Sequence, residues 1–203
     1  MKDTFHGWST VGQMDIDVVA DLIATGRKVS DVKPDDWLIN NFIGFPDQNK
    51  LILDFGCGFG RNAFGMAKHS KKWTIIGYDN EAMLSKVPEF ATINYKGELP
   101  ENLLFMSDWN RVSLYKVDVI VCTLVLQHIY EHTLIKYIQN FKKMTHRLVV
   151  SGRRFNDDAT KRSTWTILEE EGLIPDKFYG VNGEMPYTAE GDPEEHNTAV
   201  YVL

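Results

Sequence analysis

Three alternating glycines follow an acidic residue in the run LILDFGCGFGRN, where Asp54 precedes Gly56, Gly58 and Gly60. Glycines between a strand and a helix let a ligand approach the backbone closely. A dinucleotide-binding fingerprint would need its third glycine at Arg61, and no Lys-Ser/Thr pair follows for a phosphate-binding loop. A carboxylate at the strand end suits a positively charged group better than a pyrophosphate. The run predicts a cationic or zwitterionic cofactor, with a tight turn that binds no ligand as the alternative.

The run LDFGCGFGRN resembles motif I of the class I methyltransferases, and the order of elements agrees with that family from about residue 50 onward. The resemblance implies S-adenosylmethionine as cofactor, with S-adenosylhomocysteine as product. It also implies that Asp79, at the end of the second strand, accepts hydrogen bonds from the ribose hydroxyls. Alternatively, Asp79 caps the helix that starts at Glu81.

Two later segments extend the resemblance. Asp108 and Trp109 follow the third strand, where family members contact the adenine, although an aspartate there can also be simple turn chemistry. The segment VDVIVCTLVLQHI is similar to motif IV of the family. The cofactor-binding residues that the resemblance implies are Asp54, Gly56, Cys57, Gly58, Gly60, Asn62, Asp79, Asn80, Asp108, Trp109, Thr123 and Gln127.

His128 is the candidate catalytic base. It follows the fourth strand at the carboxyl edge of the sheet, where ligands bind in open α/β folds. A base is needed only when the acceptor must lose a proton. Alternatively, His128 orients the cofactor or caps the next helix. With Glu131 and His132 it also matches an HxxEH zinc motif, but that motif needs one long helix, so we expect no metal.

Substrate contacts are expected on the same edge. Arg153 and Arg154 follow the fifth strand and could bind a carboxylate or phosphate of the acceptor; surface ion pairs with Asp157 or Asp158 are the alternative. The acidic loop 182–197 and the segment 5–15 could cover the acceptor site. A solvated acidic loop is the other interpretation.

The acceptor class follows from charge and from missing motifs. The net charge of -6 disfavours nucleic acid and anionic membranes as partners. CTLVLQ lacks the Asn/Asp-Pro-Pro-aromatic run of nucleic-acid amino methyltransferases, and no proline precedes Cys122 as in cytosine-C5 enzymes. We expect a small-molecule acceptor, with a protein side chain as second choice. The alternatives are a cofactor-binding or scaffold module without transfer, and a nucleotide-dependent oxidoreductase.

The elements that must position these residues alternate between strand and helix. Together they predict one doubly wound α/β domain with a seven-stranded, mainly parallel sheet and an antiparallel C-terminal hairpin. The strands are expected at 51–55, 73–79, 103–106, 117–122, 146–152, 177–181 and 198–203. The helices are expected at 61–69, from 81, at 131–143 and at about 157–171. Two helices, at 14–26 and from Pro34 to Phe42, form an N-terminal cap (1–48) before the core (49–203).

Composition supports a folded, cytoplasmic protein. The chain has 203 residues, 43% of them hydrophobic and 12% aromatic, which suits one domain with one core. Cys57 and Cys122 lie in apolar runs and are expected to be buried rather than nucleophilic or disulfide-bonded. Neither a secretion signal nor a membrane-spanning run is recognisable, and nothing indicates the oligomeric state.

Overall fold

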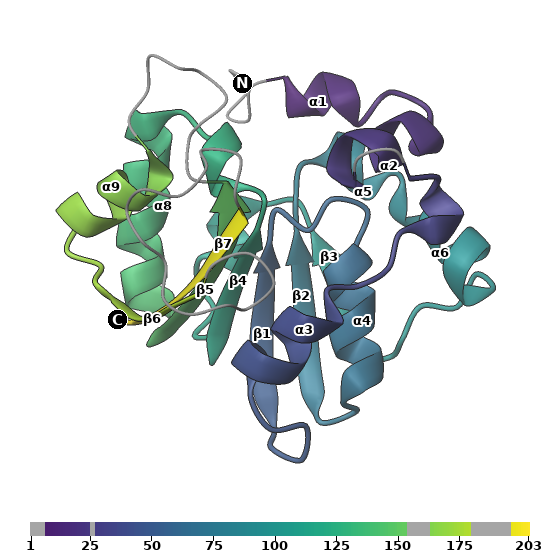
Figure 1. The fold of residues 1–203 in the computed structure, drawn as a ribbon. Helices are drawn as coiled ribbons and strands as arrows, with labels where there is room; N and C mark the ends of the chain where they lie inside the picture. The colour runs from purple at the N-terminus through teal and green to yellow at the C-terminus, as the bar shows by residue number, and fades with distance from the viewer. Residues whose placement is uncertain (1–6, 25–26, 154–162, 180–195) are drawn as a thin grey trace.

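A seven-stranded sheet forms the centre of the protein in a computed structural model that describes residues 7–24, 27–153, 163–179 and 196–203 (Figure 1). The strands are β1 (Lys50–Phe55), β2 (Trp73–Tyr78), β3 (Leu103–Met106), β4 (Val119–Thr123), β5 (Arg147–Arg153), β6 (Pro175–Tyr179) and β7 (His196–Val202). Their order is β3-β2-β1-β4-β5-β7-β6. Strands β1 to β5 pair in parallel, whereas β7 is antiparallel to both β5 and β6. The predicted fold is confirmed.

Helices connect and cover the strands. The α-helices are α1 (Trp8–Val11), α2 (Ile16–Ala24), α3 (Asp36–Leu38), α4 (Arg61–His69), α5 (Glu81–Leu84), α6 (Val87–Tyr95), α7 (Trp109–Val112), α8 (Glu131–Met144) and α9 (Thr164–Glu170). The other helical turns are η1 (Val29–Asp31), η2 (Ile39–Ile43) and η3 (Leu126–His128). Within the described ranges, no helix is long and apolar enough to cross a membrane.

Both faces of the sheet are buried, which explains why β1 is a continuous apolar run rather than an alternating one. On one face, Ile52 packs with Ala63 and Met66 of α4. On the other, Leu53 and Phe55 pack with α8 and α9. The two helical layers therefore hold β1 in the middle of the domain and place its carboxyl end between them.

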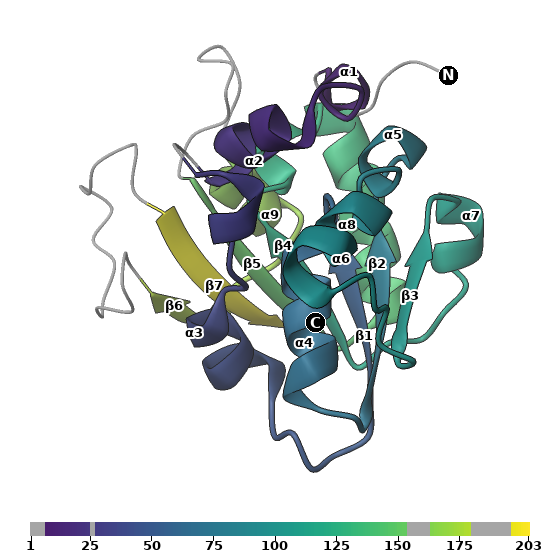
Figure 2. The ribbon, with the colours of Figure 1, turned by 90° about the vertical axis from the view of Figure 1, so that its right-hand side faces the viewer.

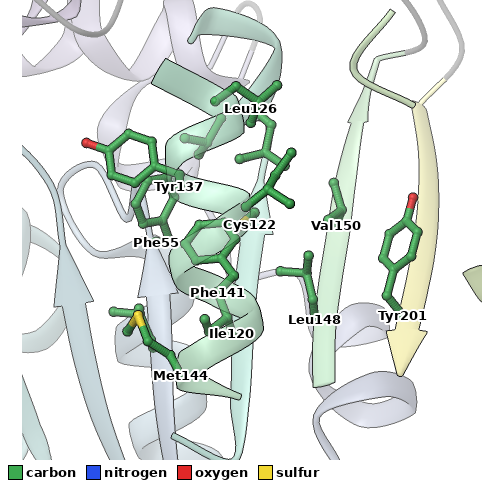
Figure 3. Close-up of a cluster of buried hydrophobic side chains, with 14 of the residues drawn as sticks. Phe55, Ile120, Cys122, Leu126, Tyr137, Phe141, Met144, Leu148, Val150 and Tyr201 are labelled. Atoms are coloured by element: carbon green, nitrogen blue, oxygen red, sulfur yellow. The ribbon is translucent and has the colours of Figure 1, made fainter. Parts of the chain in front are cut away.

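The larger core cluster lies between the sheet and α8, where Phe55, Cys122 and Phe141 point toward one another (Figure 3). Cys122 is fully buried there, and Cys57 is buried beside the glycine turn; both are free thiols. Burial raises the pKa of each thiol, so neither is a ready nucleophile. The prediction that both cysteines are buried is confirmed.

Helices α1 and α2 lie over the carboxyl ends of the parallel strands, next to α5 (Figures 1 and 2). Ile16, Val19 and Ala20 of α2 are buried against Phe59 and Phe90 in a third apolar cluster. This packing ties the N-terminal segment to the same edge of the sheet where the glycine run ends.

Several boundaries differ from the sequence expectations. The short helices α1 and α7 were not expected, nor was α6 as a separate helix after the one that starts at Glu81. Pro88 stands in the first turn of α6, a position where its missing N–H costs nothing, and Phe90 is buried. Pro34 was expected inside the second helix, but α3 starts at Asp36. Strands β6 and β7 begin earlier than predicted, at Pro175 and His196.

The remaining points concern the C-terminal part of the chain and the predicted N-terminal cap (1–48). The helix expected from about 157 begins at Thr164, while 157–162, Arg154 and most of the acidic loop lie outside the described residues. Asp35 caps α3, accepting a hydrogen bond from the Leu38 N–H at 2.9 Å. The division into a cap (1–48) and a core (49–203) stays a prediction.

Candidate cofactor and acceptor site

A cleft opens at the carboxyl ends of the parallel strands, beneath α1 and α2. Counting the open space at its mouth, it holds about 1040 Å³ that no protein atom fills. Its lining residues come from both the sheet edge and the N-terminal helices. They are Trp8, Leu22, Ile23, Asp54, Gly56, Cys57, Gly58, Phe59, Arg61, Asn62, Asp79, Met83, Thr123, Leu124, Val125, Gln127 and His128.

The glycine turn forms the floor of the cleft. Gly56, Gly58 and Gly60 all have positive φ, at 72°, 60° and 95°. The Gly56 and Cys57 N–H groups both donate to the Tyr78 carbonyl, at 2.8 and 3.0 Å. A Cβ at Gly56 would lie 2.4 Å from both γ-methyls of Val125, so tight packing requires glycine here. Gly58 faces the cleft, and the turn presents its backbone to the open space.

Asp54 is the most unusual charged residue of the site. It is only 2% exposed at the end of β1. Burial raises its pKa to about 7; the Arg61 charge opposes this, the Asp79 charge adds to it, and a hydrogen bond from the Ala63 N–H opposes it. Its Oδ2 atom is buried and has no hydrogen-bond partner among the described residues. A buried carboxylate oxygen of this kind needs a donor, and a bound ligand with a cationic group would supply one.

Asp79 is the second buried carboxylate. Burial raises its pKa to about 6, although the N–H groups of Gly58 and Asn80 donate to it at 2.8 and 2.7 Å. It does not cap α5, because the Asn80 side chain does so by accepting from the Met83 N–H at 3.0 Å. The capping alternative for Asp79 is therefore wrong. Asp79 instead links the glycine turn to the start of α5.

Arg61 and Asn62 begin α4 at the wall of the cleft. Burial lowers the pKa of Arg61, and the charges of Asp35 and Asp54 counteract this. The Asn62 side chain accepts from the Asp35 N–H at 2.9 Å and donates to Thr123 Oγ1 at 3.3 Å. Asn62 thus joins the start of α4 to the residue before α3 and to the end of β4, and so has a structural role.

The end of β4 contributes Thr123, Gln127 and His128 to the cleft. Gln127 is 4% exposed, whereas His128 is half-buried. The His128 ring lies edge-on to Trp8, with ring centroids 4.9 Å apart and an interplanar angle of 61°.

The HxxEH match does not form the helical arrangement that a zinc site would need. His128 ends η3, whereas Glu131 is the first residue of α8, with His132 next to it. In the part of the chain that the structure describes, no group of three or more His, Cys, Asp and Glu side chains could hold a metal ion.

Several predicted site residues lie away from the cleft lining. Asp108 is exposed and caps α7, accepting from the Asn110 N–H at 3.0 Å. Trp109 packs edge-on against Phe55 and Tyr137 in the core, with ring centroids 5.4 and 4.9 Å apart. Their contact with the adenine stays a prediction. Gly60 and Asn80 support the lining from behind: a Cβ on Gly60 would meet the Phe105 ring at 2.7 Å.

The two arginines are the remaining predicted site residues. Arg153 is the last residue of β5, paired with His196 of β7. Arg154 lies outside the described residues, so the role of this pair at the acceptor stays a prediction.

Comparison with known proteins relates this chain to methyltransferases. Residues 52–147 match a family model described as a methyltransferase domain. A search of curated protein sequences gives no match to the chain. The segment that matches contains the glycine turn, Asp79 and the end of β4. Residues 52–147, a little under half of the chain, thus resemble a methyltransferase domain in sequence.

Solved structures share the fold at low identity. A SAM-dependent methyltransferase from Aquifex aeolicus is 16% identical over 93% of this chain and 98% of that one, with a TM-score of 0.64. A TehB-like SAM-dependent methyltransferase from Corynebacterium glutamicum is 18% identical over 91% and 93%, with a TM-score of 0.61. Magnesium protoporphyrin IX methyltransferase from Synechocystis PCC 6803, solved with bound SAM, is 16% identical over 93% and 97%, with a TM-score of 0.59.

Some residues that line the cleft were not predicted as site residues. They are Trp8, Leu22, Ile23, Phe59, Arg61, Met83, Leu124 and Val125. Trp8 lies in the segment that we expected to cover the acceptor site, so position alone could have indicated it. Leu22 and Ile23 looked like the apolar face of a helix, a pattern that indicates burial but not against which surface.

Proposed function

We propose that this chain transfers the methyl group of S-adenosylmethionine to a small-molecule acceptor. The observation that carries the proposal is the buried Asp54 Oδ2 atom, without a partner among the described residues, at the head of a glycine turn. S-adenosylmethionine combines an ammonium, a carboxylate and a sulfonium, so its net charge is positive. The two buried carboxylates of the cleft, set against Arg61, favour such a ligand.

Each group of the cofactor has a matching residue. Asp54 would accept from the ammonium, and Arg61 would bind the carboxylate. Asp79 would accept from the ribose hydroxyls at Oδ2, which accepts one bond from the Gly58 N–H and keeps a further lone pair, whereas Oδ1 already accepts two bonds from Asn80. The magnesium protoporphyrin IX methyltransferase solved with bound SAM shares this fold, which supports the proposal.

Methyl transfer depends mainly on holding the acceptor atom in line with the methyl group and the sulfur. Held by Asp54, Arg61 and Asp79, S-adenosylmethionine would supply a sulfonium-activated methyl group for the acceptor's electron pair, with a neutral thioether as the leaving group. His128 would take the proton of an acceptor hydroxyl from its place at the end of β4. Trp8, Leu22 and Ile23 would keep water from the reacting atoms.

A small acceptor agrees with the charge of the chain and with some of the structural neighbours. The net charge of -6 disfavours nucleic acid. Proteins that share the fold include a mitomycin 7-O-methyltransferase and an O-methyltransferase solved in complex with apigenin. A protein side chain is the second choice, and Arg153 and Arg154 are proposed to bind an acidic group of the acceptor.

Calorimetry with S-adenosylhomocysteine tests cofactor binding. Asp79→Ala should weaken binding about tenfold to a hundredfold, because hydrogen bonds to a charged group contribute roughly 1.5–3 kcal/mol. Asp79→Asn keeps an acceptor for the Gly58 N–H, so its affinity for S-adenosylhomocysteine should lie between those of the parent and the alanine variant. Asp47→Ala, which removes an exposed carboxylate in the turn before β1, is the matched control. Equal binding by the parent and Asp79→Ala would overturn the assignment.

Transfer needs a separate experiment. The protein is incubated with methyl-labelled cofactor and a fractionated metabolite extract, and label is followed into each fraction. Label in one fraction, absent with Asp79→Ala, is the expected result. Cofactor binding without transfer to any small-molecule or protein fraction would favour a cofactor-binding module.

A further inference from the structure

Helix α1 completes the cleft from outside the segment that matches the methyltransferase family. Trp8 is its first residue and lines the cleft, whereas the matched segment begins at residue 52. The helix lies over the carboxyl ends of the strands, beside α5 (Figures 1 and 2). This part of the wall therefore comes from outside the matched segment.

Gly12 seats α1 directly on the backbone of α5. It is buried, and a Cβ at this position would lie 2.6 Å from the Ala82 carbonyl carbon and 2.7 Å from the Met83 nitrogen. Its φ of -61° is ordinary for any residue, so only this close approach requires glycine. Helix α5 starts immediately after Asn80, which also donates to Asp79. The seat of α1 is thus built on the same element that follows the second carboxylate.

Trp8, the first residue of α1, contacts the candidate base. Its indole lies edge-on to the His128 imidazole with centroids 4.9 Å apart. The His128 backbone is held by its N–H bond to the Val125 carbonyl at 2.9 Å. The backbone bond places the residue at the end of β4, and the indole restricts how its ring turns.

We propose that Trp8 is a positioning residue that orients the His128 ring toward the acceptor, and that the Gly12 seat on α5 sets the place of Trp8. The importance of the His128 ring rests on the proposed function; the contact chain from α5 through Gly12 and Trp8 to His128 does not. An aromatic ring at position 8 is needed because edge-on ring contact fixes an orientation that a flexible aliphatic side chain leaves open.

NMR of the ligand-free protein tests the contact chain. Trp8→Leu should remove the nuclear Overhauser effects between residue 8 and the His128 ring and shift the ring resonances, which are assigned with His128→Gln. Trp8→Phe should keep both the nuclear Overhauser effects and the parental ring resonances of His128. Gly12→Ala should reproduce the Trp8→Leu shift although it alters neither ring, while Thr10→Ala, at an exposed position of α1, should not. A parental His128 spectrum in both Gly12→Ala and Trp8→Leu would overturn the proposal.

The consequence for transfer is measured with the label assay on the active fraction. Trp8→Leu should lower kcat about tenfold, since misplacing a reacting group by about 1 Å can cost up to a hundredfold. Trp8→Phe should keep most of the parental kcat. In Trp8→Leu, the affinity for S-adenosylhomocysteine should change less than kcat does. Loss of the ring contacts with unchanged kcat would contradict the positioning role. Absence of all label transfer would refute the proposed function while leaving the NMR result to decide the contact chain.

Discussion

The two walls of the cleft are held in place by different means. The glycine turn lies between β1 and α4, where Asp54 and Asp79 are buried and backbone hydrogen bonds from Gly56, Cys57 and Gly58 connect neighbouring strands. The N-terminal cover, which comprises α1 and α2, has no buried residue within α1. It rests on α5 through the close approach of Gly12.

The two walls also differ in the chemistry of their side chains. The glycine-turn wall has two carboxylates whose pKa burial raises, so it is suited to a cation. The cover contributes apolar side chains, and Leu22 is 53% exposed while it lines the cleft. In the proposed function, the sheet edge would bind charge and the N-terminal cover would exclude water. We expect changes in the glycine turn to cost far more than matched changes in the cover.

The largest difference is expected between two glycines with positive φ. Gly56→Ala places a Cβ 2.4 Å from both γ-methyls of Val125. It should cost about 1–2 kcal/mol for the backbone and about 1–3 kcal/mol more for overpacking. Gly7→Ala, with φ 83° but nothing within 4 Å, should cost the backbone contribution at most. Urea unfolding measures both, and Val125→Ala combined with Gly56→Ala should recover part of the loss. Equal losses in the two single variants would remove the contrast.

The next effect depends on pH. Burial raises the pKa of Asp54 from 3.8 to about 7, so between these values the folded chain keeps a proton that the unfolded chain has released. The free energy of unfolding should therefore fall as the pH rises from about 4 to about 7, by an amount on the order of 1–3 kcal/mol. Above about 7 both states are ionised and this contribution levels off. Urea unfolding across this range measures the slope.

Two variants and one ligand complete the pH experiment. Asp54→Asn should flatten the slope, leaving the smaller contribution of Asp79, whose pKa is raised to about 6. Asp17→Asn, an exposed carboxylate of α2, should leave the slope unchanged. S-adenosylhomocysteine affinity should rise with pH through about 7 in the parent but not in Asp54→Asn, because the ligand ammonium binds the ionised carboxylate. A parental slope in Asp54→Asn would refute this account.

The smallest effect concerns Asn62, which joins α4 to the start of α3 and to the end of β4. Asn62→Ala removes the bonds to the Asp35 N–H and Thr123 Oγ1 and leaves a partly buried N–H without that acceptor. We expect a loss of about 1–2 kcal/mol in unfolding free energy. Asn41→Ala removes an exposed bond to the Trp37 carbonyl and should change stability by less than about 0.5 kcal/mol. Similar values for the two asparagines would mean that the bonds of Asn62 to Asp35 and Thr123 do not stabilise the fold.

Much of the sheet could be predicted because its strands are short apolar runs buried on both faces. The short helices could not: α1 and α7 span four residues each, too few to show a period. Helix α6 was missed because Pro88 resembles a loop signal, although a proline in the first helical turn is allowed. Asp79 could be placed at the cleft from its position after β2, but Asp108 and Trp109 show that a similar position after β3 does not ensure a place in the lining.

The amino-acid sequence by itself determined the strand that ends at Asp54, the glycine turn and the acidic residue after β2. These are local features, since positive φ and close backbone packing restrict a position to glycine. Only the tertiary structure decided that Trp8 meets His128, that Asn80 rather than Asp79 caps α5, and that Asp54 Oδ2 stays without a partner among the described residues. Each of these depends on contacts or burial set by the whole packed edge of the sheet. No local pattern encodes such contacts.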